Sequence, residues 1–431
     1  MRATTTVGSS SWYTAFRQIG QLVAVTMGAG VTVAAPLRCR LVFLDLSPDE
    51  RALRDELRTY FAELVRARAA DDLDDEVMGE GWKATIRQMG RDGWLGIGWP
   101  TQYGGQGRGP IEQLIFLEEA GRAGAPIPLV TLNTVGPTIA QFGTEEQKKR
   151  FLPPILGGEI HFAIGYTEPG AGTDLASLRT RAVRDGDEYV VNGQKVFTSG
   201  GHEADFVWLA CRTDPDAPKH KGISILIVDT TSPGFKWTPI NTLAGGFTSA
   251  TYYEDVRVPV AMRVGPEHGG WKMITTQLNF ERVALGPSGR IYRSLDAVLE
   301  WARQTRLADG SLVSDQEWVR ATLARVRAKA EVAELFNWRV AWSQEHGHVN
   351  PADASAMKVY GTQLRIEAAD LLLEVLGAAG ILREESPGAL LAGTLEREYR
   401  SAVVGTFGGG VNEVQREIIA TAGMGMPRAP R

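Results

Sequence analysis

Cysteine is almost absent from this chain, and its scarcity excludes two kinds of scaffold. The 431 residues contain only Cys39 and Cys211, which stand in unrelated contexts and form no CxxC or Cys/His spacing. Neither a disulfide framework nor a zinc site is therefore indicated. We expect a reducing, cytoplasmic setting and no bound metal.

Clusters of basic residues and long apolar runs are missing too. The formal net charge is -5, and no basic run interleaved with aromatic residues occurs, so nothing points to a nucleic-acid partner. A mildly apolar stretch, residues 19–36, is interrupted by Gly and Thr, which argues against a membrane span. With 43 % apolar and 23 % charged residues, the rest has the composition of a globular protein large enough for two or three domains.

Acidic residues are absent from the first 44 positions, which carry four arginines before the first acid, Asp45. Basic, acid-poor beginnings are typical of leader segments, and chain ends are often poorly ordered. We therefore predict that residues 1–44 form an extension, either disordered or leader-like, ahead of the folded body.

The body changes character twice, and this order predicts the fold class. Residues 45–160 have helical periodicity, beginning at Ser47-Pro48-Asp49-Glu50 with proline just inside the cap and acids in the first turn. Residues 161–270 hold short β-branched and aromatic runs separated by turn residues, and residues 271–431 are helical again. The sequence predicts an α+β protein with an N-terminal helical domain, a middle antiparallel β-barrel domain and a C-terminal helical bundle.

The segment GYTEPGAGTD, Gly165 to Asp174, is a glycine-rich loop that follows a predicted strand. Glycines allow backbone N–H groups to approach an anion or a flat ring closely. The loop does not match a dinucleotide fingerprint, because Leu175 stands where the third glycine belongs, and no Gly-Lys-Ser/Thr follows to make a P-loop. Taken alone, such a loop is more often a simple turn.

The loop and the stretch VNGQKVFTSGG, residues 191–201, together resemble the acyl-CoA dehydrogenase family, and the resemblance extends over residues 45–431. It implies bound FAD, removal of two hydrogens from an acyl-CoA thioester, and an electron acceptor such as an electron-transfer flavoprotein. The residues that it implies in cofactor binding are Tyr166, Thr167, Gly172, Thr173, Phe197, Ser199 and Gln415. Thr173 would also meet the CoA portion of the substrate.

The reaction needs a base, and the common position for it is empty here. An α-proton beside a thioester is weakly acidic, so the base must be poorly solvated and the carbonyl must be polarised. Many family members carry the base as a glutamate a few residues before a Gln-Arg pair. Counting back from Gln415 in TFGGGVNEVQRE gives Gly409, while Glu413 lies four residues along. By the resemblance, the backbone N–H of Gly409 would donate to the thioester carbonyl.

A second position for the base is filled. The stretch LNFERVAL resembles the motif of a minority branch, including the isovaleryl and long-chain enzymes, with Glu281 at the base position. We expect Asn279 and Arg282 to contact the substrate. An ion pair between Glu281 and Arg282 is the structural alternative, but adjacent residues on a helix do not face each other.

In homotetrameric family members each subunit also contributes residues to the FAD site of its neighbour, and those residues are altered here. In WARQTRLADGSLVSDQ, Thr305 and Ala308 stand where homotetrameric members have the arginine and phenylalanine of RxxFG. The stretch EVLGAAG, Glu374 to Gly380, replaces QxxGGxG, and a carboxylate beside a pyrophosphate is repulsive. We therefore expect a heterotetramer, α2β2, in which a related subunit completes the FAD site.

This arrangement resembles the α2β2 acyl-CoA dehydrogenases of actinobacterial steroid side-chain degradation, in particular their glutamate-bearing subunit. The substrate implied is a steroid with a CoA-thioester side chain, such as a 3-oxo-cholestenoyl-CoA. The alternatives are a homotetrameric short- or branched-chain acyl-CoA dehydrogenase, an acyl-CoA oxidase, and a non-catalytic scaffold subunit of such a complex.

Overall fold

The computed structural model describes residues 45–67, 79–284, 288–347 and 350–428, except for the side chains of residues 278–284. The predicted extension, residues 1–44, lies outside the described part. All of the residues described below belong to one unit, Leu44–Arg431.

The first helical block begins where the sequence predicts it. Ser47 Oγ accepts a hydrogen bond from the Glu50 N–H at 3.2 Å, and the Glu50 carboxylate accepts one from the Ser47 N–H at 2.5 Å. This reciprocal cap satisfies two donors that a helix start leaves free. The helices of the block are α2 (Pro48–Arg66), α3 (Glu80–Arg91), α4 (Pro110–Ala123), α5 (Gly136–Phe142) and α6 (Glu145–Leu156), with a π-helical turn, η4 (Val130–Val135), before α5.

Eight strands form the middle region. They are β1 (Phe162–Gly165), β2 (Arg181–Asp185), β3 (Glu188–Lys195), β4 (Phe206–Arg212), β5 (Ile223–Asp229), β6 (Phe235–Asn241), β7 (Phe247–Pro259) and β8 (Arg263–Val264). The order in the sheet is β6-β7-β3-β2-β4-β5-β8, and most pairs are antiparallel.

The pairing around β4 differs from the purely antiparallel expectation. One edge of β4 is shared, because β2 pairs with it only at Arg181 and Arg212, in parallel. The remainder of that edge, Phe206 to Leu209, pairs in parallel with β1. The short β1 thus provides hydrogen-bond partners for the β4 backbone groups that β2 does not reach. Buried N–H and C=O groups need such partners.

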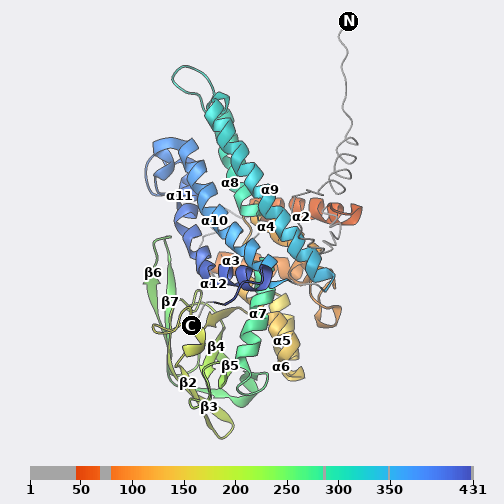
Figure 1. Cartoon of the computed structure of the whole chain (residues 1–431), viewed down its shortest axis with the longest axis vertical. Helices are drawn as coiled ribbons and strands as arrows, with labels where there is room; N and C mark the ends of the chain where they lie inside the picture. Colours follow the sequence, from red (N-terminus) through yellow and green to blue (C-terminus); the bar gives the residue numbers. More distant parts are fainter. Residues whose placement is uncertain (1–44, 68–78, 285–287, 348–349, 429–431) are drawn as a thin grey trace, which may run out of the picture. The chain divides into compact units, whose positions relative to one another are not determined.

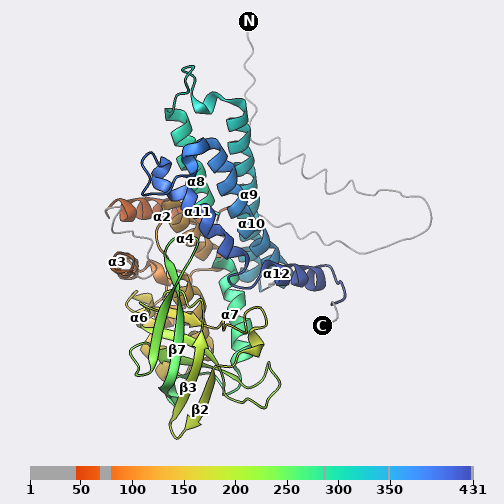
Figure 2. The same ribbon diagram turned by 90° about the vertical axis from the view of Figure 1, so that its left-hand side faces the viewer.

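The C-terminal region is helical. Its helices are α7 (Gly270–Ala284), α8 (Gly289–Gln304), α9 (Glu317–Glu345), α10 (Pro351–Leu376), α11 (Thr394–Ala402) and α12 (Asn412–Ile418). Helices α8, α9 and α10 run alongside one another, while α7 leads away from them along the strands (Figures 1 and 2). Within the described residues, no helix is both long and apolar enough to span a membrane.

Two hydrophobic cores hold these layers together. The larger joins the first helical block to the inner faces of β3, β4 and β5, and a second lies among α8, α9 and α10. The α+β class, with helical regions before and after a central sheet, is confirmed.

Candidate active site

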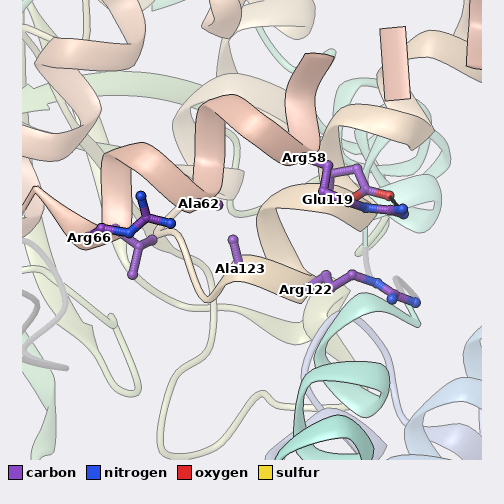
Figure 3. Close-up of a pocket in the computed structure, with 7 residues that line it drawn as sticks. Arg58, Ala62, Arg66, Glu119, Arg122 and Ala123 are labelled. Atoms are coloured by element: carbon purple, nitrogen blue, oxygen red, sulfur yellow. Dashed lines mark hydrogen bonds and ion pairs between the residues drawn. The ribbon is translucent and has the colours of Figure 1, made fainter. Parts of the chain in front are cut away.

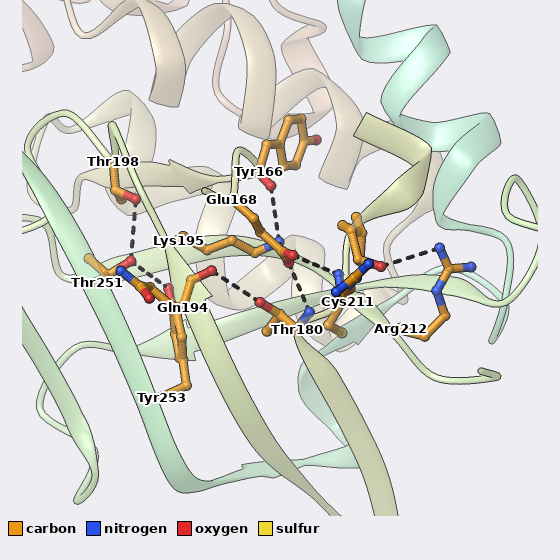
Figure 4. A network of polar contacts seen from close by, with 12 residues as sticks. Tyr166, Glu168, Thr180, Gln194, Lys195, Thr198, Cys211, Arg212, Thr251 and Tyr253 are labelled. Atoms are coloured by element: carbon orange, nitrogen blue, oxygen red, sulfur yellow. Dashed lines mark hydrogen bonds and ion pairs between the residues drawn. The ribbon is translucent and has the colours of Figure 1, made fainter. Parts of the chain in front are cut away.

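The glycine-rich loop leaves β1 and is anchored by a buried ion pair. Lys195 on β3 is fully buried and donates from Nζ to Glu168 Oε1 at 2.8 Å and to the Tyr166 carbonyl at 3.0 Å (Figure 4). The Glu168 carboxylate also accepts from the backbone N–H groups of Arg179 and Thr180, at 2.7 and 2.8 Å. A buried charge needs several partners. Here these partners join the start of the loop to β3 and to the residues just before β2.

The electrostatics of the pair favour the ionised carboxylate. Burial alone would raise the pKa of Glu168, but the Lys195 ammonium and the two backbone donors hold that pKa below its ordinary value. Nearby, burial raises the pKa of the Cys211 thiol to about 12, so this cysteine stays protonated and unreactive at neutral pH.

Arg212, at the end of β4, is a second anchor (Figure 4). Its guanidinium donates to the carbonyls of Lys219 and Lys221 at 3.1 and 2.8 Å, and to that of Ala176 at 2.6 Å. The side chain therefore joins the end of the glycine-rich segment to the β4–β5 connection.

The outer part of the loop faces open space. A Cβ added at Gly170 or Gly172 would meet no atom within 4 Å, and Thr173 is exposed. Asp174 accepts hydrogen bonds from Lys219 at 2.7 Å and from Ser177 at 2.5 Å, and these donors lower its pKa. The two glycines are not required by packing within the described residues, so their lack of a side chain leaves room for a bound group.

Phe197 is unusual in both backbone and side chain. Its φ is +60°, in the left-handed region that non-glycine residues rarely adopt, and its side chain is 62 % exposed. Flanking contacts hold it there, since the Thr198 N–H donates to the Ser249 carbonyl at 2.9 Å and Ser199 Oγ lies 3.1 Å from Thr248 Oγ1. Strain and exposure of this kind cluster where ligands bind.

Tyr166 connects the loop to α7. Its hydroxyl donates to Gln277 Oε1 at 2.6 Å and accepts from Trp208 Nε1 at 3.1 Å. Gln277 is buried and stands four residues, about one helical turn, before Glu281. The side chains of Glu281, Asn279 and Arg282 lie outside the described residues, so the structure gives only their places on the helix.

The loop around Gly409 has its own buried lysine. Gly409 adopts φ +65°, which suits glycine, in the turn before α12. Lys358 on α10 is 1 % exposed and donates to the carbonyls of Thr406 and Gly410 and to Asn412 Oδ1, the last at 2.9 Å. Two buried lysines, Lys195 and Lys358, thus each fix one loop on which predicted site residues stand.

Gln415 lies one turn into α12 and is 3 % exposed. Its Oε1 has no hydrogen-bond partner among the residues that the structure describes. An unpaired buried amide oxygen is costly, so a donor from a bound group or another chain would satisfy it.

The residues of the altered half-site lie on the surface. Thr305 follows the last residue of α8, and Ala308 is exposed in the loop after it, where the Arg306 guanidinium donates to the Gly310 carbonyl at 2.6 Å. Glu374 is exposed near the end of α10, and Gly377 ends that helix with φ +66°. None of these residues contacts the glycine-rich loop through a described hydrogen bond or ion pair.

Sequence reasoning named the loop residues but missed the groups that hold them. Lys195, Arg212 and Lys358 were not singled out, although a lysine inside an apolar strand or helix pattern is a usable signal of a paired buried charge. Gln277 and Trp208, the partners of Tyr166, carried no local signal.

A hollow between α2 and α4 contains none of the predicted site residues (Figure 3). It is lined by Arg66, Arg122 and a two-point ion pair between Arg58 and Glu119, with contacts of 2.9 and 2.8 Å. In the part of the chain that the structure covers, no group of His, Cys, Asp and Glu side chains could hold a metal ion.

Comparison with known proteins identifies the family. Models of the N-terminal, middle and C-terminal domains of acyl-CoA dehydrogenases match residues 47–159, 163–256 and 268–424. The chain belongs to the acyl-CoA dehydrogenase family. It is therefore an oxidoreductase that acts on the CH–CH bond of acyl-CoA thioesters, in a family that is generally FAD-dependent.

Particular relatives are similar over nearly the whole body. Acyl-CoA dehydrogenase FadE26 of Mycobacterium tuberculosis is 57% identical over 398 residues, covering 90% of this chain and 100% of the relative. The crystal structure of the ChsE4-ChsE5 complex from M. tuberculosis matches with a TM-score of 0.84 and 57% identity, over 90% of this chain and 100% of the matched chain. The Tcur3481-Tcur3483 steroid ACAD matches with a TM-score of 0.85 and 53% identity, with the same coverage.

Proposed function

We propose that this chain binds FAD and carries the catalytic base, Glu281, of a heterotetrameric acyl-CoA dehydrogenase that acts on a steroid side-chain CoA ester. The observation that carries the proposal is the glycine at position 409. Its φ of +65° and missing side chain leave the usual C-terminal position without a carboxylate. The glutamate on α7, one turn beyond the residue that Tyr166 holds, is then the base.

The residues present fit a flavin. The open space around Gly170 and Gly172 admits a flat ring against the loop backbone, and Phe197 offers an exposed aromatic face. We assign Tyr166, Thr167, Gly172, Thr173, Phe197, Ser199 and Gln415 to cofactor binding, with the unpaired Oε1 of Gln415 available to a donor. FAD, when bound, supplies the acceptor for the hydride that leaves the β-carbon.

The chain's own residues perform the proton transfer. The Glu281 carboxylate takes the α-proton of the acyl group, and the Gly409 N–H donates to the thioester carbonyl as negative charge develops on it. Lys358 holds the carbonyls on either side of Gly409, which keeps that N–H in one orientation. Thr173, Asn279 and Arg282 are assigned to substrate contacts.

The subunit composition follows from the altered half-site. Thr305 and Ala308 cannot supply the cation and the aromatic ring that homotetrameric members offer to a neighbour's FAD, and Glu374 adds a negative charge there. A related subunit would supply this half. Similarity to the ChsE4-ChsE5 complex and to a steroid ACAD supports both the heteromer and the substrate class. Electrons would then pass to an acceptor such as an electron-transfer flavoprotein.

The test is FAD stoichiometry and native mass, measured for this chain alone and co-expressed with a related subunit. We expect FAD only in the complex, at one per two chains. Glu281→Gln should retain the flavin but abolish its bleaching by a steroid-CoA, with Glu413→Gln as the matched control. A tetramer of this chain alone with one FAD per subunit would favour the homotetrameric enzyme instead.

A further inference from the structure

The hollow between α2 and α4 has arginine at both ends and small apolar side chains between them. Its volume of about 360 Å³ is at the lower end of the range typical of small-molecule sites, about 300–1,000 Å³. Arg66 lies at one end, and Arg58 and Arg122 lie at the other, with Ala62 and Ala123 between the two ends (Figure 3). Arg66 follows Arg58 by just over two turns of α2, so the hollow extends about 12 Å along the helix.

Glu119 neutralises only one of the three guanidinium groups in the hollow. Its carboxylate is 5 % exposed and accepts from Arg58 Nε at 2.9 Å and from Arg58 Nη2 at 2.8 Å. Each carboxylate oxygen thus has its own donor in a two-point pair, which satisfies both partners. The hollow therefore retains the positive charges of Arg66 and Arg122.

Arg122 has contacts on α8, and they leave the edge of its guanidinium available. Its Cζ lies 4.6 Å from the centroid of the Tyr292 ring, so one face of the group stacks on that ring. Its Nη1 lies 3.6 Å from Asp296 Oδ2, which is too long for a hydrogen bond, and the Asp296 side chain is 52 % exposed. Because the N–H donors of a guanidinium lie in its plane, stacking leaves them free to bind an anion.

Arg66 stands in the last turn of α2 and makes no hydrogen bond or ion pair with another described residue. The side chains that line the hollow between Arg66 and Arg122 are those of Ala62, Val65 and Ala123, which have no hydrogen-bonding group. A ligand that complements this lining has a negative charge at each end and an apolar chain between the charges. A small inorganic anion would reach only one of the two arginines.

We propose that the hollow binds an elongated organic dianion. One anionic group contacts Arg66, the other contacts Arg122, and the apolar chain lies over Ala62 and Ala123. Carboxylate and phosphate groups both match the donor geometry of guanidinium, so either can form the ends. None of the residues assigned to FAD or to the thioester lines the hollow, so the proposal stands independently of the proposed function.

The experiment is isothermal titration calorimetry of the full chain with azelate, a linear dicarboxylate. We expect saturable binding. Nonanoate has the same chain but one carboxylate, and succinate is too short to reach both arginines, so each should bind about ten-fold more weakly. A linear bisphosphonate of the length of azelate separates the two chemistries, because the tighter of the two probes identifies the anionic group that the site prefers.

Substitution of the arginines tests the two ends separately. Arg66→Gln and Arg122→Gln should each weaken azelate binding about ten-fold and remove the preference for azelate over nonanoate. Because Arg66 has no described partner to lose, its variant tests the site even if Arg122→Gln disturbs the contact with α8. Arg51→Gln removes an exposed arginine of α2 that lies outside the hollow and pairs with Asp45, so it is the matched control and should bind azelate normally.

Three outcomes would overturn the proposal. Equal affinities for azelate, nonanoate and succinate would mean general attraction of anions, and an unchanged azelate affinity in Arg66→Gln would remove one end of the site. Residues 71–76, which include five acidic residues, follow Arg66 closely in the sequence. Azelate binding that appears only after those acids are changed to Asn and Gln would assign the arginines to that segment instead.

Discussion

Tyr166 and Gln277 stand 111 residues apart in the sequence, and the Tyr166 hydroxyl lies 2.6 Å from Gln277 Oε1. One belongs to the loop proposed to hold the flavin, and the other to the helix proposed to carry the base. The same hydroxyl also accepts a hydrogen bond from Trp208, a buried residue of β4, so the loop tyrosine is held by the sheet as well as by α7. It fixes the distance between the loop and the turn of α7 that we propose carries the base.

We predict that Tyr166→Phe slows flavin reduction by acyl-CoA about ten- to thirty-fold, because the hydroxyl loses its hydrogen bonds to Gln277 and from Trp208, each worth about 1 kcal/mol. The FAD content of the complex should not change, since the Tyr166 backbone still accepts from Lys195. Anaerobic stopped-flow absorbance measures the rate. Tyr399→Phe, on the exposed surface of α11, is the control. A loss of FAD in proportion to the loss of rate would assign Tyr166 to cofactor retention instead.

The Glu168–Lys195 pair gives a prediction on stability. Lys195→Met leaves a buried carboxylate without its cation, which we expect to lower the free energy of unfolding by about 3–5 kcal/mol and to release FAD. Adding Glu168→Gln should recover part of the loss, about 1–3 kcal/mol, because the uncompensated charge is removed.

Thermal unfolding of the wild type, the two single variants and the double variant measures the coupling between Lys195 and Glu168. Flavin fluorescence reports the release of FAD. Lys236→Met, which removes an exposed lysine paired with Glu254, should change stability by less than about 1 kcal/mol. Additive effects of the two buried substitutions would mean that the pair is not coupled.

The sequence predicts the elements of this fold well where the signal is local. The caps at Ser47 and Thr144 and the strand runs depend on neighbouring residues, and the structure has helices and strands there. Contacts such as Tyr166 with Gln277, or Lys358 with Gly410, join segments 111 and 52 residues apart, and no periodicity specifies them. The parallel pairing of β1 with β4 was missed for the same reason. The roles of Glu281 and Gly409 stay predictions.

Lys358 should matter to the chemistry more than to cofactor binding. We predict that Lys358→Met lowers the rate of flavin reduction by about ten-fold or more, because the Thr406 and Gly410 carbonyls lose their shared donor and the Gly409 N–H loses its fixed orientation. FAD content should be retained. Steady-state kinetics with saturating acyl-CoA separates a fall in kcat from a rise in KM. An unchanged kcat would contradict the assignment of the Gly409 N–H to the thioester carbonyl.

Glu118 on α4 caps the start of α8 from another helix. Its carboxylate accepts from the N–H groups of Ser288 and Gly289, at 2.9 and 2.6 Å, and from Asn337 Nδ2 at 2.9 Å. Burial raises the pKa of Glu118 to about 7, against the opposing effect of these donors. The folded chain therefore holds this proton more tightly than the unfolded chain, so the resulting stabilisation is complete below about pH 4.5 and is lost as the pH rises through 7.

Glu118→Gln removes this titration and replaces an acceptor by an amide that cannot serve every donor. We expect the variant to be less stable than the wild type by about 1–3 kcal/mol near pH 5, and the difference to shrink towards pH 8. Urea unfolding at several pH values, followed by tryptophan fluorescence, measures it. Glu56→Gln, exposed on α2, should give no such trend. A difference that grows with pH would mean that the donors around Glu118 outweigh its burial and that the carboxylate is ionised in the fold.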